Sequence, residues 1–308
     1  MKQFNFDFDT NGLSDYLNAN ADLLLHKIVM DTVEAQYYKV IPNIKYGELI
    51  PVFETGDIDT IAFPGTSCQF TGGTIALTEV ELKVCQYNIQ KNYCIDELNR
   101  TIMSIRLQPG SYGESAGPGV EEAFMADISK KANVYMSRKF WNGTIAADGC
   151  SGIIEQLESA ALSGSVVNRT YTAMTPANSV AITNAYILAL PDTLKTITTI
   201  MALNHSDFQA LQLGLRDQNL FNFNPIQLAN GQMAIQIPFT NTIAISCEIA
   251  AGYMCLTNPE NFLIGTDLMS DITGPISWYS LDFQENRIKL AAKFGGAVSF
   301  GSQVVFAS

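Results

Sequence analysis

Apolar and polar positions between residues 119 and 143 recur with the period of an amphipathic helix. One apolar stripe, at three- or four-residue steps, consists of Val120, Phe124, Ile128, Ala132 and Tyr135. The residues that widen it enough to pack on a sheet are Met125, Met136 and Phe140. Acidic residues come before basic ones along the stretch, which favours the helix dipole. Pro118 suits the start and Asn142-Gly143 a left-handed end, so the pattern predicts one helix over residues 119–143.

Residues 46–95 have the pattern of a long antiparallel hairpin. Charged and apolar residues alternate in the descending part, 74–95, and this alternation puts Val80 and Leu82 on one face. Turn residues mark a tip within 64–73. Strands of this length, with one apolar face each, cannot be buried by a unit of this size alone. The hairpin is therefore either an ordinary sheet edge or an arm that lies across a neighbouring subunit.

The remaining chain divides into an acidic leading segment, an α/β lobe and a closing β segment. Helices are predicted at 22–36, 95–105, 151–162, 177–194 and 207–217, the last with Ser206 as its N-cap. Strands are predicted at 196–203, 233–238, 242–249, 262–265, 276–283, 287–294 and 297–306. A glycine-rich stretch, 108–119, precedes the long helix.

Composition narrows the possible functions of this chain of 308 residues. Charged residues make up only 16% of it, which indicates that much of its surface meets protein rather than water. The net charge of -12 argues against an avid nucleic-acid binder, which would need Lys and Arg to neutralise phosphates. We find no signal peptide at the N-terminus and no apolar run of about 20 residues, the length that a membrane span requires. The six cysteines form no CxxC pair, so free thiols in a reducing cytoplasm are expected.

Three kinds of chemistry can be weighed against the sequence. Residues 113–117 match G-x-S-x-G, the nucleophile elbow of the α/β-hydrolases, with Ser115 as the nucleophile. However, a loop precedes Ser115 where the elbow needs a strand, and His205 is the only histidine downstream. The same glycines lack the G-K-[ST] of a phosphate loop, and acidic neighbours would repel an anion. Two histidines and scattered cysteines give no metal-ligand spacing. We therefore predict no catalytic residue, no cofactor and no metal, with a Ser115 hydrolase as the alternative from another class.

The order of segments resembles the major capsid proteins of tailed phages, which have the Hong Kong 97 fold. The best local matches are LTEVELKVCQYNIQKNYCIDELNRT at 77–101, AFMADISKKANVYMSRKFWNGT at 123–144, NFLIGTDL at 261–268, and the closing 278–306. The resemblance implies an α+β fold with five segments. They are an N-terminal arm at 1–45, an extended β-hairpin loop at 46–95, a spine helix within a peripheral domain at 96–143, an α/β axial domain at 144–255, and return strands of the peripheral domain at 256–308.

The resemblance also implies function and partners. The chain would self-assemble through pentamers and hexamers into an icosahedral shell in the host bacterial cytoplasm, become part of the virion, and enclose double-stranded DNA without sequence-specific binding. A portal, a separate scaffolding protein and a decoration protein are implied as partners, and no membrane. Some family members join subunits covalently through a lysine in the extended loop. Since no lysine occurs between Lys45 and Lys83, a non-covalent shell is expected. An encapsulin-type cage with enzyme cargo is the alternative within the fold.

The predicted hairpin is acidic and the predicted spine helix is basic. The hairpin carries Glu54, Asp57 and Asp59 and has no Lys or Arg between Glu48 and Glu81. The basic residues of the helix are Lys130, Lys131, Arg138 and Lys139. We predict an assembly interface between the two elements of neighbouring subunits. Since an exposed ion pair contributes only about 0–1 kcal/mol, apolar positions such as Val80 and Leu82 would supply most of the affinity.

Overall fold

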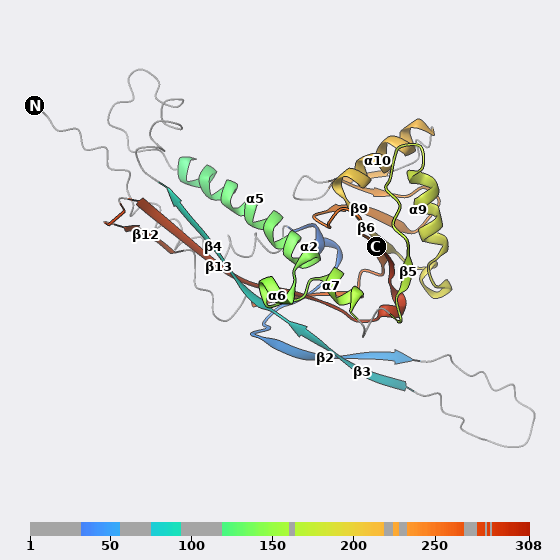
Figure 1. Cartoon of the computed structure of the whole chain (residues 1–308), viewed down its shortest axis with the longest axis horizontal. Helices are drawn as coiled ribbons and strands as arrows, with labels where there is room; N and C mark the ends of the chain where they lie inside the picture. The colour runs from blue at the N-terminus through green and yellow to red at the C-terminus, as the bar shows by residue number, and fades with distance from the viewer. Residues whose placement is uncertain are drawn as a thin grey trace, which may run out of the picture.

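The structure is a computed structural model of the chain. The residues that it describes are 32–55, 75–93, 119–159, 164–218, 224–227, 233–267, 276–280, 282–283 and 285–308. Figure 1 shows a long helix, α5, lying along a sheet that contains β4 and β13. A second lobe holds α9, α10 and the other large sheet, and a two-stranded hairpin, β2–β3, projects away from both. Several predicted features lie outside the described residues, namely the hairpin tip at 64–73, the helix at 95–105, the stretch 108–118 and Ser115.

Helix α5 (Gly119–Asn142) agrees with the predicted long helix at both ends. Its described buried face runs at four-residue steps through Ile128, Ala132, Met136 and Phe140, with Trp141 beside the last. Tyr135, which was predicted to belong to the stripe, is 40% exposed, because the fourth step falls on Met136 instead. The predicted left-handed end is also wrong. Gly143 has no positive φ, and a Cβ there would lie 2.6 Å from the Lys139 carbonyl oxygen.

The first sheet packs beneath α5 and joins segments from distant parts of the chain. Its strands are β1 (Lys39–Ile41), β4 (Cys85–Tyr93), β11 (Phe262–Thr266), β12 (Ile276–Ser280) and β13 (Glu285–Val298). The order is β1-β11-β13-β12, with β4 also pairing with β13. The sequence predicted two strands, at 287–294 and 297–306, with a break between them. This break is wrong, because β13 continues through both glycines. A side chain at Gly295 would clash with the Lys83 carbonyl, and a Cβ at Gly296 would lie 2.6 Å from Phe140 Cε2, so the glycines permit close packing rather than a turn.

The hairpin consists of β2 (Gly47–Thr55) and β3 (Ile75–Lys83), paired antiparallel over their whole length. They form a sheet of their own with no third strand among the described residues. The descending part was predicted to run on to residue 95, and this is wrong after Lys83. The chain bends there, and β4 pairs with β13 instead, from Cys85↔Phe294 to Tyr93↔Asn286.

The second sheet forms the core of the lobe in the order β5-β14-β10-β6-β9-β8-β7. Its strands are β5 (Val167–Arg169), β6 (Thr199–Asn204), β7 (Asn224–Gln227), β8 (Met233–Gln236), β9 (Thr242–Cys247), β10 (Met254–Thr257) and β14 (Val305–Ala307). The helix α10 (His205–Asp217) packs on it through Phe208 and Leu211, which share an apolar core with Leu203 of β6, and α9 (Ser179–Leu188) contributes Tyr186 to the same core. Because β14 lies in this sheet, the closing segment contributes to both sheets.

Shorter helices complete the described chain: α2 (Val33–Tyr37), α6 (Ile145–Asp148), α7 (Ile153–Glu158) and the 3₁₀ turns η2 (Asp192–Leu194) and η3 (Gly301–Gln303). Two predicted helices differ from the structure at their N-caps. Of the helix predicted at 22–36 only residues 32–36 are described, and there Thr32 has an extended backbone and caps α2, its Oγ1 accepting from Ala35 N. The N-cap of α10 is Asn204 rather than Ser206, because the Asn204 side chain accepts from the Ser206 amide.

Candidate functional site

The base of the projecting hairpin is fixed to the first sheet by a small apolar cluster. Leu82 and Val84 pack with Ile44, Leu263 and Ala297, and Leu82 is completely buried. Val84 N donates to Tyr46 O at 2.8 Å, which closes the hairpin at its root. Gly295 lets β13 pass against Lys83 at the same place. The hairpin is therefore attached rigidly at one end.

Beyond that base the described hairpin exposes charge and one large apolar side chain. Glu48, Glu79 and Glu81 are exposed, and Leu49 is 63% exposed opposite Glu81. Of the predicted apolar contact residues, Val80 is half-buried, and Leu82 contacts its own chain rather than a neighbour. The side chain of Glu54 and both Asp57 and Asp59 lie outside the described residues. The sequence pattern did not indicate Leu49, because this residue lies on the face of the hairpin that carries Glu81, opposite the face of Val80 and Leu82.

The predicted basic residues of α5 are mostly engaged within the chain. Lys131 pairs with Asp127 at 2.7 Å, and both side chains are exposed. Arg138 pairs with Glu248 at 3.1 Å. Lys139 pairs with Asp148 at 2.6 Å in a half-buried setting. Lys130 is exposed. The free positive charge that α5 offers to another molecule is thus smaller than its sequence suggests.

A groove of about 500 Å³ lies between α5 and β4. The strand side contributes Asn88 to Asn92, including Lys91, and the helix side contributes Asp127, Ile128, Lys131, Ala132 and Tyr135. Its floor is apolar, at Ile128 and Ala132, while amides, Lys91 and the Lys131–Asp127 ion pair line its edges. Such a lining suits a peptide segment that carries both apolar and acidic side chains.

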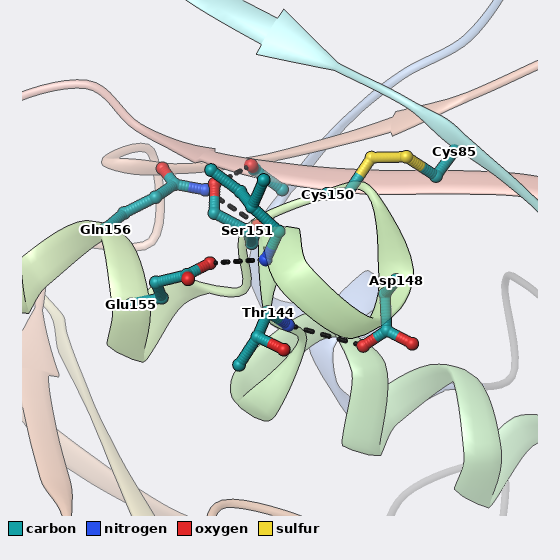
Figure 2. Close-up of a disulfide and its surroundings, with 9 residues drawn as sticks. Cys85, Thr144, Asp148, Cys150, Ser151, Glu155 and Gln156 are labelled. Carbon is teal, nitrogen blue, oxygen red and sulfur yellow. Dashed lines mark hydrogen bonds between the residues drawn. A yellow bond between two sulfur atoms is a disulfide. The ribbon is translucent and has the colours of Figure 1, made fainter.

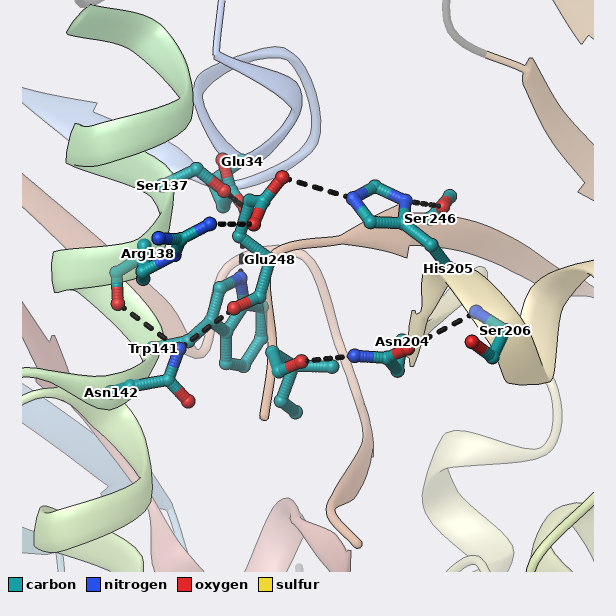
Figure 3. A network of polar contacts seen from close by, with 11 residues as sticks. Glu34, Ser137, Arg138, Trp141, Asn142, Asn204, His205, Ser206, Ser246 and Glu248 are labelled. Atoms are coloured by element: carbon teal, nitrogen blue, oxygen red, sulfur yellow. Dashed lines mark hydrogen bonds and ion pairs between the residues drawn. The ribbon is translucent and has the colours of Figure 1, made fainter. Parts of the chain in front are cut away.

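A buried carboxyl joins the start of the described chain to α5 (Figure 3). Glu34 Oε1, on α2, accepts hydrogen bonds from Ser137 Oγ at 2.6 Å and from Trp141 Nε1 at 2.8 Å. Glu34 Oε2 is buried without a hydrogen-bond partner. Burial raises the pKa of Glu34, although both hydrogen bonds act in the opposite direction. The two donors make Glu34 the polar anchor between α2 and α5.

A second polar cluster connects α5 to the lobe (Figure 3). Glu248 accepts from Arg138 on α5 and lies 3.0 Å from His205 Nε2 at the start of α10. Partial burial acts to raise the pKa of Glu248, but the hydrogen bonds from His205 and Arg138 outweigh it, and that pKa lies below its ordinary value. Asn142 Nδ2 donates to Glu248 O at 2.7 Å and its Oδ1 accepts from Ala250 N at 2.8 Å. The chain after β9 is thereby held against the end of α5.

His205 also contacts the Ser246 hydroxyl through Nδ1, which sets serine, histidine and glutamate in a row. The cluster differs from a hydrolase triad in its electrostatics. Its glutamate is shared with Arg138, which stabilises the carboxylate and weakens it as a partner for an imidazolium. We interpret it as a structural link. Among the described residues no group of three or more His, Cys, Asp or Glu could hold a metal ion.

A disulfide between Cys85 and Cys150 links β4 to the loop that follows α6 (Figure 2). The prediction of free thiols is therefore wrong for this pair. The two Cα atoms are 6.0 Å apart although 65 positions separate them in sequence, a proximity that spacing could not reveal. Nearby, Gln156 Nε2 donates to the Gly296 carbonyl at 2.7 Å and so binds α7 to β13. Cys247 and Cys255 are free and buried, as predicted.

No helix in the described part of the chain has the length and apolar character needed to cross a membrane. No protein-family model and no curated protein matches the chain.

Solved structures match the chain over almost its whole length. A chain of the satellite phage P4 procapsid has 12% identity and a TM-score of 0.57, with 93% of this chain and 98% of that chain covered. The capsid of an empty GTA particle, computed with C5 symmetry, has 12% identity and a TM-score of 0.57, covering 88% and 87%. A virus-like particle from Pyrococcus furiosus has 8% identity and a TM-score of 0.56, covering 96% and 100%.

These likenesses establish the fold at low sequence identity. The chain has the α+β fold of tailed-phage capsid proteins, and the predicted fold class is confirmed. This fold differs from that of an α/β-hydrolase, so it does not favour the Ser115 alternative.

Proposed function

We propose that this protein is the major capsid protein of a tailed bacteriophage and assembles into the icosahedral shell around its DNA genome. The observation that carries the proposal is the capsid fold, matched over 93% of the chain in the P4 procapsid comparison. The role is structural, and its working parts are surfaces that meet other copies. The low charged fraction of 16% agrees with a surface that is largely covered in an assembly.

The segments of the chain then take the roles that the resemblance implied. We assign 1–45 to the N-terminal arm, 46–95 to the extended loop with β4 at its end, and α5 to the spine of a peripheral domain. We assign 144–255 to the axial domain. We assign the strands after 256 to the peripheral domain, with one exception. The strand β14 lies beside β10 in the second sheet, which supports assigning β14 to the axial domain.

The projecting hairpin is proposed to lie on a neighbouring copy. Nine paired residues in each strand span about 30 Å, and an isolated pair of strands is at best marginally stable in water. A surface outside the chain would therefore stabilise it. The groove between α5 and β4 offers Lys91 to the acidic hairpin residues Glu48, Glu79 and Glu81, whereas Lys131 in the same groove is paired with Asp127. Leu49 would add apolar contact, in place of the Leu82 that its own chain covers.

The remaining partners follow from the same role. Copies would form rings of five and six, and the shell would contain a portal and be built around a separate scaffolding protein, with a decoration protein as a further partner. The shell would hold double-stranded DNA without reading its sequence, which agrees with a net charge of -12. Assembly would take place in the host bacterial cytoplasm before the subunit becomes part of the virion.

Electron microscopy of the purified chain, alone and with phage scaffolding protein, tests the proposal. Closed icosahedral shells or rings of five and six are expected. Boiling the particles in detergent should give one band near 33.7 kDa, because no lysine lies in the hairpin between Lys45 and Lys83 to join subunits. A ladder of covalent multimers would contradict the non-covalent shell. Particles that carry a packaged enzyme instead of DNA would favour the protein-cage alternative, and a chain that stays monomeric under all these conditions would contradict both.

A further inference from the structure

The turn between β8 and β9 holds a phenylalanine in a backbone conformation that suits glycine. Thr240 N donates to Ile237 O at 3.2 Å, which defines a turn with Pro238 and Phe239 at its centre. Phe239 has a φ of +60°, and Pro before a left-handed residue is the pattern of a type II turn, in which Gly or Asn is preferred at the second central position. A bulky aromatic residue there is uncommon and costs conformational energy.

Among the described residues the side chain gains no contact that would offset this cost. Phe239 is 93% exposed, the highest value among the exposed large apolar residues of the described chain. The described fold would be served at least as well by glycine or asparagine at this position. The phenyl ring therefore suits a contact that the described residues of one copy do not make.

Hydrogen bonds and buried neighbours on both sides hold the backbone of the turn that carries the ring. On one side Ile237 is buried in the lobe core, and on the other Thr242 is buried and its hydroxyl lies 2.9 Å from that of Thr199. Thr240 Oγ1 donates to Ile237 O at 2.9 Å and accepts from Thr242 N, which closes the turn a second time. Because the backbone of the turn is already ordered, covering the ring costs only the freedom of its own side-chain torsions.

The surroundings indicate what covers it. Residues 237–244 contain no charged side chain, which does not suit a nucleic acid and suits an apolar protein surface. The same lobe exposes Leu188 on α9 and Leu213 on α10. In a ring of identical subunits each copy presents one surface to the next and a different surface to the previous one, so a knob and its receiving surface both occur on every copy. The GTA capsid in the comparison has such five-fold symmetry.

We propose that Phe239 is a knob that packs on the apolar surface of the lobe of an adjacent copy of this chain. The inference rests on the proposed shell function and adds the contact residue and its partner. The proposal explains why a phenylalanine occupies a left-handed position, because the contact between copies would offset the conformational cost of that position.

Substitution of Phe239 separates the effect of its left-handed backbone from the effect of its exposed ring. Phe239→Gly should leave the melting temperature of the unassembled subunit equal or higher, because the left-handed turn is relieved. It should raise the subunit concentration needed for half-maximal assembly about tenfold or more, the effect of losing one buried aromatic side chain per contact. Phe239→Asn should behave like Phe239→Gly. Phe239→Leu keeps an apolar side chain and should assemble closer to the wild type.

Asn43→Gly is the matched control, because Asn43 is exposed and also has a positive φ, of 68°, but offers no apolar surface. It should leave assembly unchanged. If Phe239→Gly assembles within twofold of the wild type, or if it lowers the melting temperature of the subunit, the proposal is overturned. A wild-type chain that forms no assembly would instead contradict the proposed function itself, so the two failures are distinct.

Photocrosslinking identifies the partner directly. Benzoylphenylalanine at position 239, in assembled particles, should give a ladder of covalent multimers of this chain on irradiation. The crosslinked peptides should map to the lobe, residues 144–257, of a second copy. Crosslinks to another protein, to the body around α5, or to nothing would overturn the assignment.

Discussion

The junction at the end of α5 and the projecting hairpin differ in what stabilises them. At the junction, Phe140 and Trp141 are buried among aromatic rings, and the polar contacts of Glu34, Asn142 and Glu248 join four segments, namely α2, α5, the chain after β9 and the start of α10. The hairpin has two strands that pair only with each other, and its sole described apolar cluster is at its base. The junction is packed almost entirely by its own chain, with Glu34 Oε2 left unpaired, whereas the hairpin is packed by its own chain only at its base.

This difference separates two kinds of free energy. Substitutions at the junction should change the free energy of unfolding of a single subunit. Substitutions on the exposed part of the hairpin, beyond its base, should change the free energy of assembly and leave unfolding almost unaltered. The following experiments test that separation, from the largest expected effect on unfolding to the smallest.

Phe140→Ala should destabilise the subunit most. The ring is buried against Tyr38, Trp141 and Phe294, with centroids 5.2 to 6.3 Å away, so truncation leaves a cavity. We expect a loss of about 3–5 kcal/mol in a urea titration. The control is Tyr135→Ala on the exposed side of the same helix, which should cost clearly less. Equal losses for the two would mean that the buried face of α5 has been assigned wrongly.

Cys150→Ser should reduce the free energy of unfolding by roughly 2–4 kcal/mol, because the disulfide closes a long loop of the unfolded chain. The measurement is urea unfolding under oxidising conditions, followed by mass spectrometry of the alkylated protein. Adding reductant should lower the wild type to the level of the variant and leave the variant unchanged. Cys247→Ser is the control for a buried free thiol, and the stability that this variant loses should not depend on reductant. A wild type that is insensitive to reductant would contradict a stabilising disulfide.

Glu34→Gln should stabilise the subunit at neutral pH, on the order of 1 kcal/mol, because it removes a buried ionisable group and keeps an acceptor for Ser137 and Trp141. The pKa of Glu34 is raised in the folded state, so the folded chain binds the proton more tightly than the unfolded chain. Its contribution to stability is full below the ordinary value of 4.5 and is lost as pH rises through the folded pKa. The advantage of the variant should therefore disappear as the pH is lowered towards that ordinary value.

Glu248→Gln is the matched control with the opposite sign. The pKa of Glu248 is lowered in the folded state, so its stabilisation is present above its ordinary value and is lost as pH falls through the folded pKa. This variant should be less stable than the wild type at neutral pH, with the difference vanishing in acid. Thermal melts between pH 4 and pH 8 measure both variants. Parallel curves for the two would contradict the assigned roles.

Leu49→Ser should have the smallest effect on unfolding, within about 0.5 kcal/mol, because the side chain is already in water. Its effect on assembly should be large, seen as fewer particles in sedimentation at equal protein concentration. Leu82→Ala, one strand away, should do the reverse and destabilise the subunit, because Leu82 is completely buried. Unimpaired assembly of Leu49→Ser would show that the exposed face of the hairpin is not a contact.

The sequence predicted α5 well because a long periodic pattern and a proline before it are local signals. It predicted β13 in two pieces, because two adjacent glycines signal a turn when nothing is known of the neighbours. In the structure the same glycines make room for Lys83 and Phe140, which are far away in sequence. The glycines were thus recognised as special positions, but the reason for them is close packing against residues that are distant in sequence.

The candidate site shows the same limit. Alternation correctly identified the apolar face of β3, but it could not tell which molecule covers that face, and Leu82 is covered by its own chain. The positive charges of α5 were read from sequence, while their acidic partners Glu248 and Asp148 lie in other segments. The contact of Glu34 with Trp141 joins positions 107 apart, and no spacing rule predicts it.

The order of strands has a consequence for how the chain is made. β1 pairs with β11, which is synthesised much later, and β14, from the last residues, lies between β5 and β10. The first sheet therefore has an unfilled place until β13 has been synthesised, and the second until β14 has been synthesised, and folding of non-local strands of this kind is slow. A product that stops before Val305 lacks the buried strand Val305–Ala307 and cannot form the complete second sheet. Because β14 lies between β5 and β10 rather than at an edge, such a product would be excluded from the proposed shell.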